Sequence, residues 1–349
     1  MTHLARLLLI GAALATLPCL AHGQAKSPWP AGDEIGMANT LGLATWRRCA
    51  QHLVHPKAKA YELSYLRSNT MPQSPFAVPL KENAKPTVGV PMTRHAFNTD
   101  EVVSGDPGQQ GTQMDALGHF AVLPQAWDGK GEFSSAGATY YGGYTQQQVK
   151  PRPDSPLQKL GIDKVPPIVS TAVLLDAKTH LGKGKPMEAG ALVTAKDIEA
   201  MLKAQGLGKR GLQAGDVLYI YTGWGDHWKD PDTEKFYYTK GPGLAYDAAK
   251  LIEQKKVVLV ALDNPFTDPV PDGMLQGKAA PPAGVPDGLP FSIHHHNLAV
   301  AGIHNIQNAN LGEIAKDKVW LSCTMILPLR TQGASGSPVR PVAIGAPGK

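Results

Sequence analysis

The feature that most constrains the fold is a series of short apolar runs rich in β-branched residues, which are separated by polar and helix-like segments. They are "PPIVSTAVLLDA" (166–177), "GDVLYIYTGWG" (215–225), "KVVLVALDN" (256–264), "WLSCTMILPL" (320–329) and "PVRPVAIG" (338–345). Runs of this length and composition predict short β-strands.

Segments with helical periodicity lie between these runs. In "TAKDIEAMLKAQGLG", Thr194 suits the N-cap, apolar residues follow at helical spacing, and Gly206 suits the C-terminal stop. "GLAYDAAKLIEQKK" (243–256) predicts a second helix, and "IHHHNLAVAGI" (293–303) predicts a third. The alternation of strands and helices predicts an α/β domain, in which functional residues gather on loops at the strand ends.

The chain contains 37 Gly and 30 Pro among 349 residues, more than an average globular protein. They fall between the strand-like runs and form no tract, so we expect many loops and no long linker. No internal repeat is found. We therefore expect residues 24–349 to form a single domain.

The N-terminus has the pattern of a secretory signal. Arg6 precedes an apolar run from Leu7 to Ala21 that is too short to span a bilayer and ends in small residues. We expect a cleaved signal peptide over residues 1–23 and a secreted or periplasmic protein. Pro18 stands where a small residue should precede a lipidated Cys19, so we expect no lipoprotein. No later run approaches ~18 apolar residues, so no membrane segment is expected after cleavage.

The charge of the chain limits the kinds of binding partner to expect, and its cysteines limit the possible disulfides. Lys and Arg number 34 and Asp and Glu 29, scattered along the chain, so nothing favours nucleic acid. We expect a small-molecule substrate. Cys49 and Cys323 remain after cleavage, and in an oxidising compartment they can form one disulfide or stay as two buried thiols.

The stretch "QQGTQMDALGHF" (109–120) combines a carboxylate and an imidazole. Asp115 and His119 are four residues apart, which places them on one side of a helix, and Gln113 and Asp115 share one face of an extended strand. An Asp beside a His can orient the imidazole or share a metal with it. From the spacing alone, a functional site and a capped turn with a solvated Asp both stay open.

This stretch resembles the signature His-x-Gly-Thr-His-x-Asp-x-Pro-x-His of the cyclase superfamily, which includes bacterial kynurenine formamidases and isatin hydrolase. Gly111, Thr112, Asp115 and His119 match it, whereas Gln109 and Gln113 replace two ligand histidines and Leu117 replaces the proline.

A second block resembles the same family. There a later His is followed twelve residues on by an acidic or amide ligand, with Ala-Gly-Ile before that ligand. In "HHHNLAVAGIHNIQNANL" these positions fall on His295 and Gln307. His294, His296, His227 and Asp226 are alternative ligands. Other blocks in the same order extend the resemblance from about residue 90 to residue 345.

The resemblance implies a swivelling β/β/α fold with a mixed sheet, assembled as a homodimer or homotetramer. It also implies a divalent metal, zinc or manganese, that helps to hydrolyse a small amide or cyclic amide. His119 would be the catalytic acid–base residue. The implied metal ligands are Asp115, His295, Gln113, Gln109 and Gln307.

The glutamines weaken this metal site, because an amide oxygen is a poorer ligand for zinc than an imidazole nitrogen. We therefore expect either an oxygen-rich site that prefers manganese, magnesium or calcium, or a site that has lost its metal. For the substrate, Trp224, Trp228 and Asp263 are candidate binding residues, although buried tryptophans are more often part of the core. No nucleophile elbow, phosphate loop or dinucleotide motif occurs.

The leading hypothesis is an exported metal-dependent hydrolase of an amide, cyclic imide or lactone bond in a small cyclic or aromatic substrate. Such an arylformamidase-like activity includes reactions of tryptophan catabolism. One alternative is a non-catalytic protein that kept the fold and binds a small ligand. Another is a lyase or cyclase that uses the same site.

Overall fold

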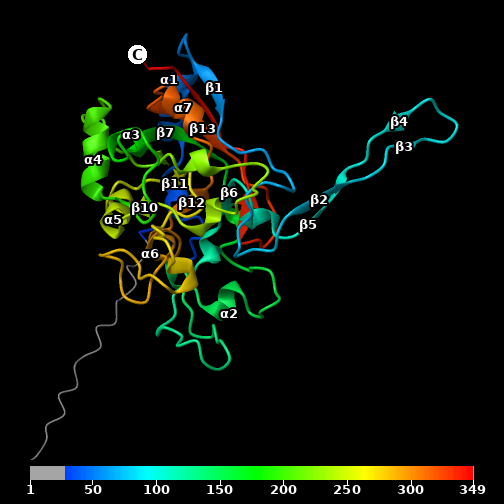
Figure 1. Cartoon of the computed structure of the whole chain (residues 1–349), viewed down its shortest axis with the longest axis horizontal. Helices are drawn as coiled ribbons and strands as arrows, with labels where there is room; N and C mark the ends of the chain where they lie inside the picture. Colours follow the sequence, from blue (N-terminus) through cyan, green and yellow to red (C-terminus); the bar gives the residue numbers. More distant parts are fainter. Residues whose placement is uncertain (1–27, 349) are drawn as a thin grey trace, which may run out of the picture.

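A nine-stranded mixed sheet forms the centre of the molecule in the computed structural model, which describes residues 28–348 (Figure 1). The predicted signal peptide lies outside the described residues. In spatial order the strands are β1 (Lys59–Glu62), β15 (Val342–Gly345), β13 (Leu321–Ile326), β7 (Ile168–Asp176), β9 (Val217–Tyr221), β11 (Leu259–Leu262), β12 (His304–Gln307), β6 (Gln113–Asp115) and β14 (Gly336–Pro338).

Four adjacent strands of this sheet, β7, β9, β11 and β12, run parallel. The strands on both sides of these four pair antiparallel. The crossover between β7 and β9 contains α4 (Ala195–Ala204), and that between β9 and β11 contains α5 (Tyr246–Gln254). This confirms the predicted α/β fold with a mixed sheet, and it places the ends of several strands along one edge, as in other parallel sheets.

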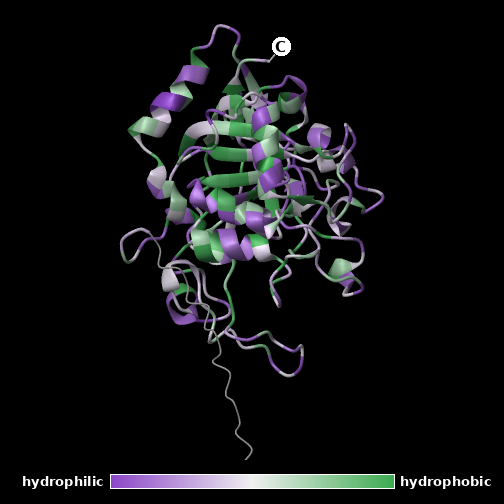
Figure 2. Ribbon diagram, turned by 90° about the vertical axis from the view of Figure 1, so that its left-hand side faces the viewer, coloured by the Kyte–Doolittle hydropathy of each residue, from purple (hydrophilic) through white to green (hydrophobic). Residues whose placement is uncertain are grey.

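Helices cover the sheet on both faces, and the most apolar strands lie between them (Figure 2). Val173 and Leu175 of β7 pack with α4, α5 and Ile293 of α6 (Ser292–His294). On the other face the core includes residues of α7 (Gly312–Lys316). The other helices are α1 (Leu43–Leu53), α2 (Gln146–Val149) and α3 (Ala177–His180).

The N-terminus of α4 is capped as its sequence predicts. Asp197 N donates to Thr194 Oγ1 over 3.2 Å, and Gly206 adopts the left-handed conformation after the helix ends. The predicted third helix is irregular. It begins as α6 and continues as a π-helix over His295–Ala301. The histidine triplet therefore lies at the junction between two helical periodicities.

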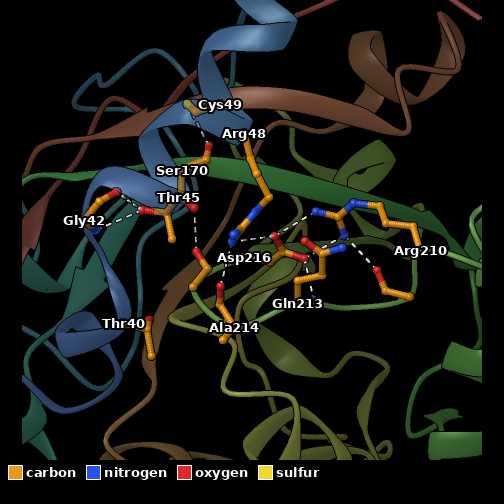
Figure 3. A network of polar contacts seen from close by, with 12 residues as sticks. Thr40, Gly42, Thr45, Arg48, Cys49, Ser170, Arg210, Gln213, Ala214 and Asp216 are labelled. Carbon is orange, nitrogen blue, oxygen red and sulfur yellow. Dashed lines mark hydrogen bonds and ion pairs between the residues drawn. The ribbon is translucent and has the colours of Figure 1, made fainter.

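A polar network (Figure 3) attaches α1 to the sheet, and a disulfide adds a covalent link. Arg210 forms two hydrogen bonds of 2.7 and 2.8 Å with the buried carboxylate of Asp216, and Arg48 donates to the carbonyl of Ala214. Cys49 of α1 is joined to Cys323 of β13. Of the two states that the sequence left open for these cysteines, the structure has the disulfide.

An arm projects from the body of the molecule (Figure 1). It is an antiparallel hairpin of β2 (Lys81–Ala84) with β5 (Glu101–Ser104), extended by β3 (Val88–Gly89) with β4 (Ala96–Phe97). A further two-stranded sheet pairs β8 (Leu192–Val193) with β10 (Gly243–Leu244). Within residues 28–348, no helix has the length and apolar character needed to cross a bilayer.

Candidate active site

A cavity of about 270 Å³ lies beside β6 and the end of β12. Its walls combine six polar side chains from the two sequence motifs with several aromatic rings. The lining residues are Ser74, Phe76, Ala77, Asp106, Gln109, Gln113, Asp115, His119, Phe120, Tyr238, Pro265, Phe266, Phe291, His294 and Gln307.

Strand β6 brings the first motif to this cavity. It lies between β12 and β14, with Gln113 opposite Gln307 and Asp115 opposite Gly336. Because alternate residues of a strand share a face, Gln113 and Asp115 point to the same side, as the sequence predicts. Gln307 ends β12, so the two motifs meet although they are almost 200 residues apart.

The side chains of Gln109, Gln113, Asp115 and Gln307 form hydrogen bonds with one another, but these bonds use only some of their polar atoms. Gln113 Nε2 donates to Gln109 Oε1 over 3.1 Å, and Gln307 Nε2 donates to Asp115 Oδ2 over 2.7 Å. Four other buried polar atoms of these residues have no hydrogen-bond partner. They are Gln109 Nε2, Gln113 Oε1, Asp115 Oδ1 and Gln307 Oε1. Buried polar groups normally have partners, so these atoms are candidates for binding a ligand, water or ion.

His119 lies in a 3-10 turn, Leu117–His119, directly after β6. Its ring centroid is 6.4 Å from that of His294 and 5.5 Å from that of Phe120. Burial lowers the pKa of His119, although the Asp115 carboxylate partly offsets the effect. The imidazole is therefore uncharged near neutral pH. Burial opposes the charge of Asp115, but His119, His294 and the hydrogen bond from Gln307 hold its pKa below the ordinary value.

His294 is the histidine of the triplet that lines the cavity, in place of the predicted His295. Asp268 fixes it from behind by a short hydrogen bond to Nδ1, and Asp268 also accepts from the backbone N–H of Ile293 over 2.6 Å. Burial disfavours a charged imidazole, but the Asp268 and Asp115 carboxylates raise the pKa of His294 to about 10. His294 was one of the alternatives that the sequence offered.

The change of helix type explains the shift of one residue. The π-helix begins at His295, directly after His294, so the α-helical spacing does not continue through the triplet. His296 points elsewhere and lies 2.9 Å from a carboxylate oxygen of Glu253. His295 is also buried but does not line the cavity. The resemblance favoured His295, which lies twelve residues before Gln307. In the structure the cavity is lined by His294, which lies thirteen residues before Gln307.

The three predicted substrate-binding residues lie outside the cavity. Trp224 is buried and donates from Nε1 to the carbonyl of Tyr237, whereas Trp228 stacks on Tyr65 with ring centroids 4.3 Å apart. These tryptophans are packing residues because the turn after β9 folds them against other rings and away from the cavity.

Asp263 has a structural role as well. It follows β11, and its Oδ1 accepts two hydrogen bonds of 2.7 Å from the N–H and hydroxyl of Thr222. Its Oδ2 accepts from Gly225 N over 3.1 Å. Burial raises the pKa of Asp263 to about 6. The Asp263 side chain stabilises the turn that follows the neighbouring strand β9. It therefore points toward that turn and does not line the cavity.

Sequence reasoning missed several groups that the structure brings to the cavity. Asp268, which holds His294, lies four residues after the predicted strand 256–264, where the sequence offered only Asp263 as a candidate. The aromatic lining residues come from loops with no periodic signal. They are Phe76, Phe120, Tyr238, Phe266 and Phe291.

The kind of side-chain atoms around the cavity decides whether a metal ion can bind there. Within residues 28–348, no group of three or more His, Cys, Asp and Glu side chains is arranged to hold an ion. Gln113 Oε1, Asp115 Oδ1 and Gln307 Oε1 are buried and unpartnered around one cavity, and such oxygens suit a hard divalent ion better than zinc. The residues present fit an oxygen-bound cation.

The fold and the cavity define a mixed-sheet α/β protein with a buried carboxylate, an imidazole and amide groups around one site. A model of the family described as "Putative cyclase" matches residues 61–269, more than half of the chain. The chain therefore belongs to the cyclase superfamily, as the two motifs predicted.

Similar sequences include kynurenine formamidases of Bacillus cereus and Bacillus thuringiensis. Each is 32% identical over 101 residues, which make up 29% of this chain and 39% of the relative. The matched region thus spans well under half the length of these curated relatives.

Solved structures share the fold over most of the chain. A crystal structure of a novel cyclase has a TM-score of 0.71 at 23% identity and covers 92% of this chain and 97% of its own. An isatin hydrolase bound to the product analogue thioisatinate has a TM-score of 0.53 at 17% identity, with coverages of 84% and 94%. Isatin hydrolase A from Ralstonia solanacearum has a TM-score of 0.51 at 19% identity, with coverages of 85% and 95%.

Proposed function

We propose that this protein is a hydrolase that opens an amide, cyclic imide or lactone bond in a small cyclic or aromatic compound. The observation that carries the proposal is that the uncharged imidazole of His119 and the unpartnered Oδ1 of Asp115 line one cavity. Membership of a family with formamidase and isatin hydrolase relatives supports it.

His119 is the proposed general base. Its ring lines the cavity, and no hydrogen bond from a described residue contributes to its pKa, so a ring nitrogen is available to a water there. The ring takes a proton from the attacking water and returns it to the leaving nitrogen or oxygen. An imidazole suits both steps because its pKa lies near neutrality.

Gln109 and Asp115 are the proposed orienting groups. The carboxylate Oδ1 of Asp115 accepts a hydrogen bond from the water and so directs it. The unpartnered Nε2 of Gln109 donates to the carbonyl oxygen, where negative charge develops. Gln113 keeps the Gln109 amide in this orientation through the 3.1 Å hydrogen bond between them.

A divalent cation is the proposed cofactor, held by Gln113 Oε1, Asp115 Oδ1 and Gln307 Oε1. When bound, it supplies Lewis-acid polarisation and lowers the pKa of water. Its ligands are oxygens, so we expect manganese, or another hard cation such as magnesium or calcium, to bind in preference to zinc.

The test is hydrolysis of formanilide, isatin, phthalimide and dihydrocoumarin by the wild type, His119→Ala and the exposed control His55→Ala. We expect turnover of at least one compound by the wild type and the control, and a loss of roughly 10²-fold or more in His119→Ala. Equal rates in all three proteins would contradict the proposal. Binding without turnover in all three would favour a ligand-binding protein. Elemental analysis of protein purified without added metal tests the cofactor.

We also propose that the protein is exported and forms a homo-oligomer. The Cys49–Cys323 disulfide supports a secreted or periplasmic location, since such bonds persist in oxidising compartments.

The arm supports self-association, because an isolated two-stranded ribbon is only marginally stable in water and this one exposes Met92, Phe97 and Val102. Cell fractionation and light scattering of the purified protein test these two points.

A further inference from the structure

The turn that carries His119 rests on a loop from another part of the chain. Gly118, one residue before His119, donates from its backbone N–H to the carbonyl of Leu160 over 2.9 Å. The two segments are in close contact, because a β-carbon at Gly118 would lie only 3.0 Å from that carbonyl oxygen. The position of Leu160 therefore limits where the His119 turn can lie.

Leu160 has a backbone conformation that a leucine seldom adopts. Its φ is 60°, in the left-handed region, where the β-carbon crowds the backbone. Its side chain is buried and packs in one cluster with Leu117 and Leu298. A conformation of this kind persists only where the surrounding structure holds it. Leu160 thus depends on a partner for its backbone as well as on its packing.

Glu34 supplies that partner. Its Oε2 accepts a hydrogen bond of 2.9 Å from Leu160 N, and its Oε1 accepts one of 2.9 Å from Lys159 Nζ. The Glu34 side chain is 17% exposed, whereas that of Lys159 is 44% exposed. A hydrogen bond to a charged acceptor is stronger than one between neutral groups, and an ion pair to an exposed lysine contributes little. The contact with Leu160 N is therefore the one that holds the loop.

The segment that carries Glu34 is itself fixed to the body of the molecule. Asp33 Oδ2 accepts a hydrogen bond of 2.7 Å from the hydroxyl of Tyr141. Met37 N donates over 2.7 Å to the carbonyl of Gly302, which ends the π-helix. Glu34 therefore extends from an anchored segment and can transmit that anchorage to the loop.

We propose that Glu34 is a positioning residue for the general base: it holds the Leu160 loop, and this loop sets the place of the His119 imidazole relative to the Asp115 carboxylate. The inference rests on the proposed function, which makes His119 the base. A displacement of about 1 Å can cost roughly 10²-fold in rate, so a contact outside the cavity can control turnover. Because Glu34 does not line the cavity, its loss should lower kcat and leave KM nearly unchanged.

The test compares two replacements of similar length. Glu34→Gln keeps an oxygen that can accept from Leu160 N, whereas Glu34→Met has none, and both lose the charge that faces Lys159. The substrate is whichever of formanilide, isatin, phthalimide and dihydrocoumarin the wild type hydrolyses fastest. We expect kcat to fall roughly 10-fold or more in Glu34→Met, with KM within about 3-fold of the wild type, and Glu34→Gln to keep both constants within about 3-fold. The exposed control Glu199→Ala should change neither constant.

Nuclear magnetic resonance of the full chain labelled with ¹³C in histidine adds a measurement that needs no turnover. The Cε1–Hε1 signal of His119, identified by its absence in His119→Ala, should move in Glu34→Met and stay in place in Glu34→Gln. The signals of the exposed His55 and His180 should move in neither. If methionine prevents folding, Glu34→Ala removes the same acceptor and takes its place in both measurements.

Equal kcat in the Gln and Met variants, a loss confined to KM, or a fall in kcat with an unmoved His119 signal would overturn the inference. If the wild type hydrolyses none of the four compounds, the hydrolase proposal fails separately. The His119 signal alone then decides whether Glu34 positions the ring: a shift in Glu34→Met and none in Glu34→Gln supports that role, and the same signal in both variants overturns it.

Discussion

Gln307 Nε2 donates a hydrogen bond to Asp115 Oδ2 over 2.7 Å and lies 3.0 Å from His294 Nε2. An uncharged amide thus stands between a carboxylate and an imidazole. A second carboxylate at this position would face Asp115 directly, and the two like charges would repel each other in a buried site unless a cation or a proton lay between them.

Gln307→Glu is therefore expected to lower stability in the absence of metal by roughly 2 kcal/mol or more, because it buries a second charge beside Asp115. Manganese or zinc should restore much of this loss, and the rise in melting temperature on adding metal should exceed that of the wild type. The measurement is a thermal melt with and without each ion. Gln276→Glu makes the same chemical change on the surface, and a similar response from both variants would contradict the prediction.

Asp268→Asn tests the group that sequence reasoning missed. The variant keeps the size of the side chain but removes the charge that holds Nδ1 of His294, so we expect activity to fall roughly 10- to 100-fold. The pKa of His294, followed by NMR, should fall as well, because the Asp268 carboxylate raises it. The exposed Asp272→Asn variant is the control. An unchanged rate with an unchanged His294 titration would refute the role of Asp268.

The pH dependence of activity follows from His119. Burial lowers its pKa below 6.5, and a general base works only when it is unprotonated. We therefore expect kcat/KM to stay level from pH 8 down to about 6.5 and to fall at lower pH. His119→Asn should remove most of the activity together with this acid limb. A limb centred above pH 7 in the wild type would argue against His119 as the base.

The fold was predictable from sequence because its signals are local. The strands β7, β9, β11 and β13 coincide with apolar β-branched runs, and Thr194 and Gly206 bound α4. The pairing of the two motifs was predictable only through the family resemblance, since nothing in a single sequence shows that Gln113 lies opposite Gln307.

The remaining parts of the site depend on geometry that has no periodic signature. A π-helix starting at His295 moves the cavity-facing histidine to His294. The turn after β9 carries Trp224 away from the cavity, whereas loops far apart in sequence bring Phe76 and Phe291 into it. Such placements arise from tertiary packing, which composition and spacing do not encode.

His304 gives a pH dependence of stability that is separate from activity. It is fully buried in β12, and burial lowers its pKa to about 4. The unfolded chain binds a proton near pH 6.5 and the native chain only near pH 4, so stability falls as pH drops through this window. The loss at this site is roughly 3 kcal/mol over the window. Urea unfolding at pH 7 and pH 4.5 measures it, and His304→Gln should show a shallower pH slope than the wild type.

The Cys49–Cys323 disulfide closes a loop across 274 positions, joining α1 to β13. Cross-links that close long loops restrict the unfolded chain most, so removing this one should cost roughly 2–5 kcal/mol. The double variant Cys49→Ala/Cys323→Ala is expected to melt at a lower temperature than the oxidised wild type and to show no further change with dithiothreitol. Reduced wild type should approach the melting temperature of the double variant. If reduction exposes free thiols and still leaves the melting temperature of the wild type unchanged, the disulfide does not contribute to stability. The network of Asp216 with Arg48 and Arg210 would then suffice to hold α1 on the sheet.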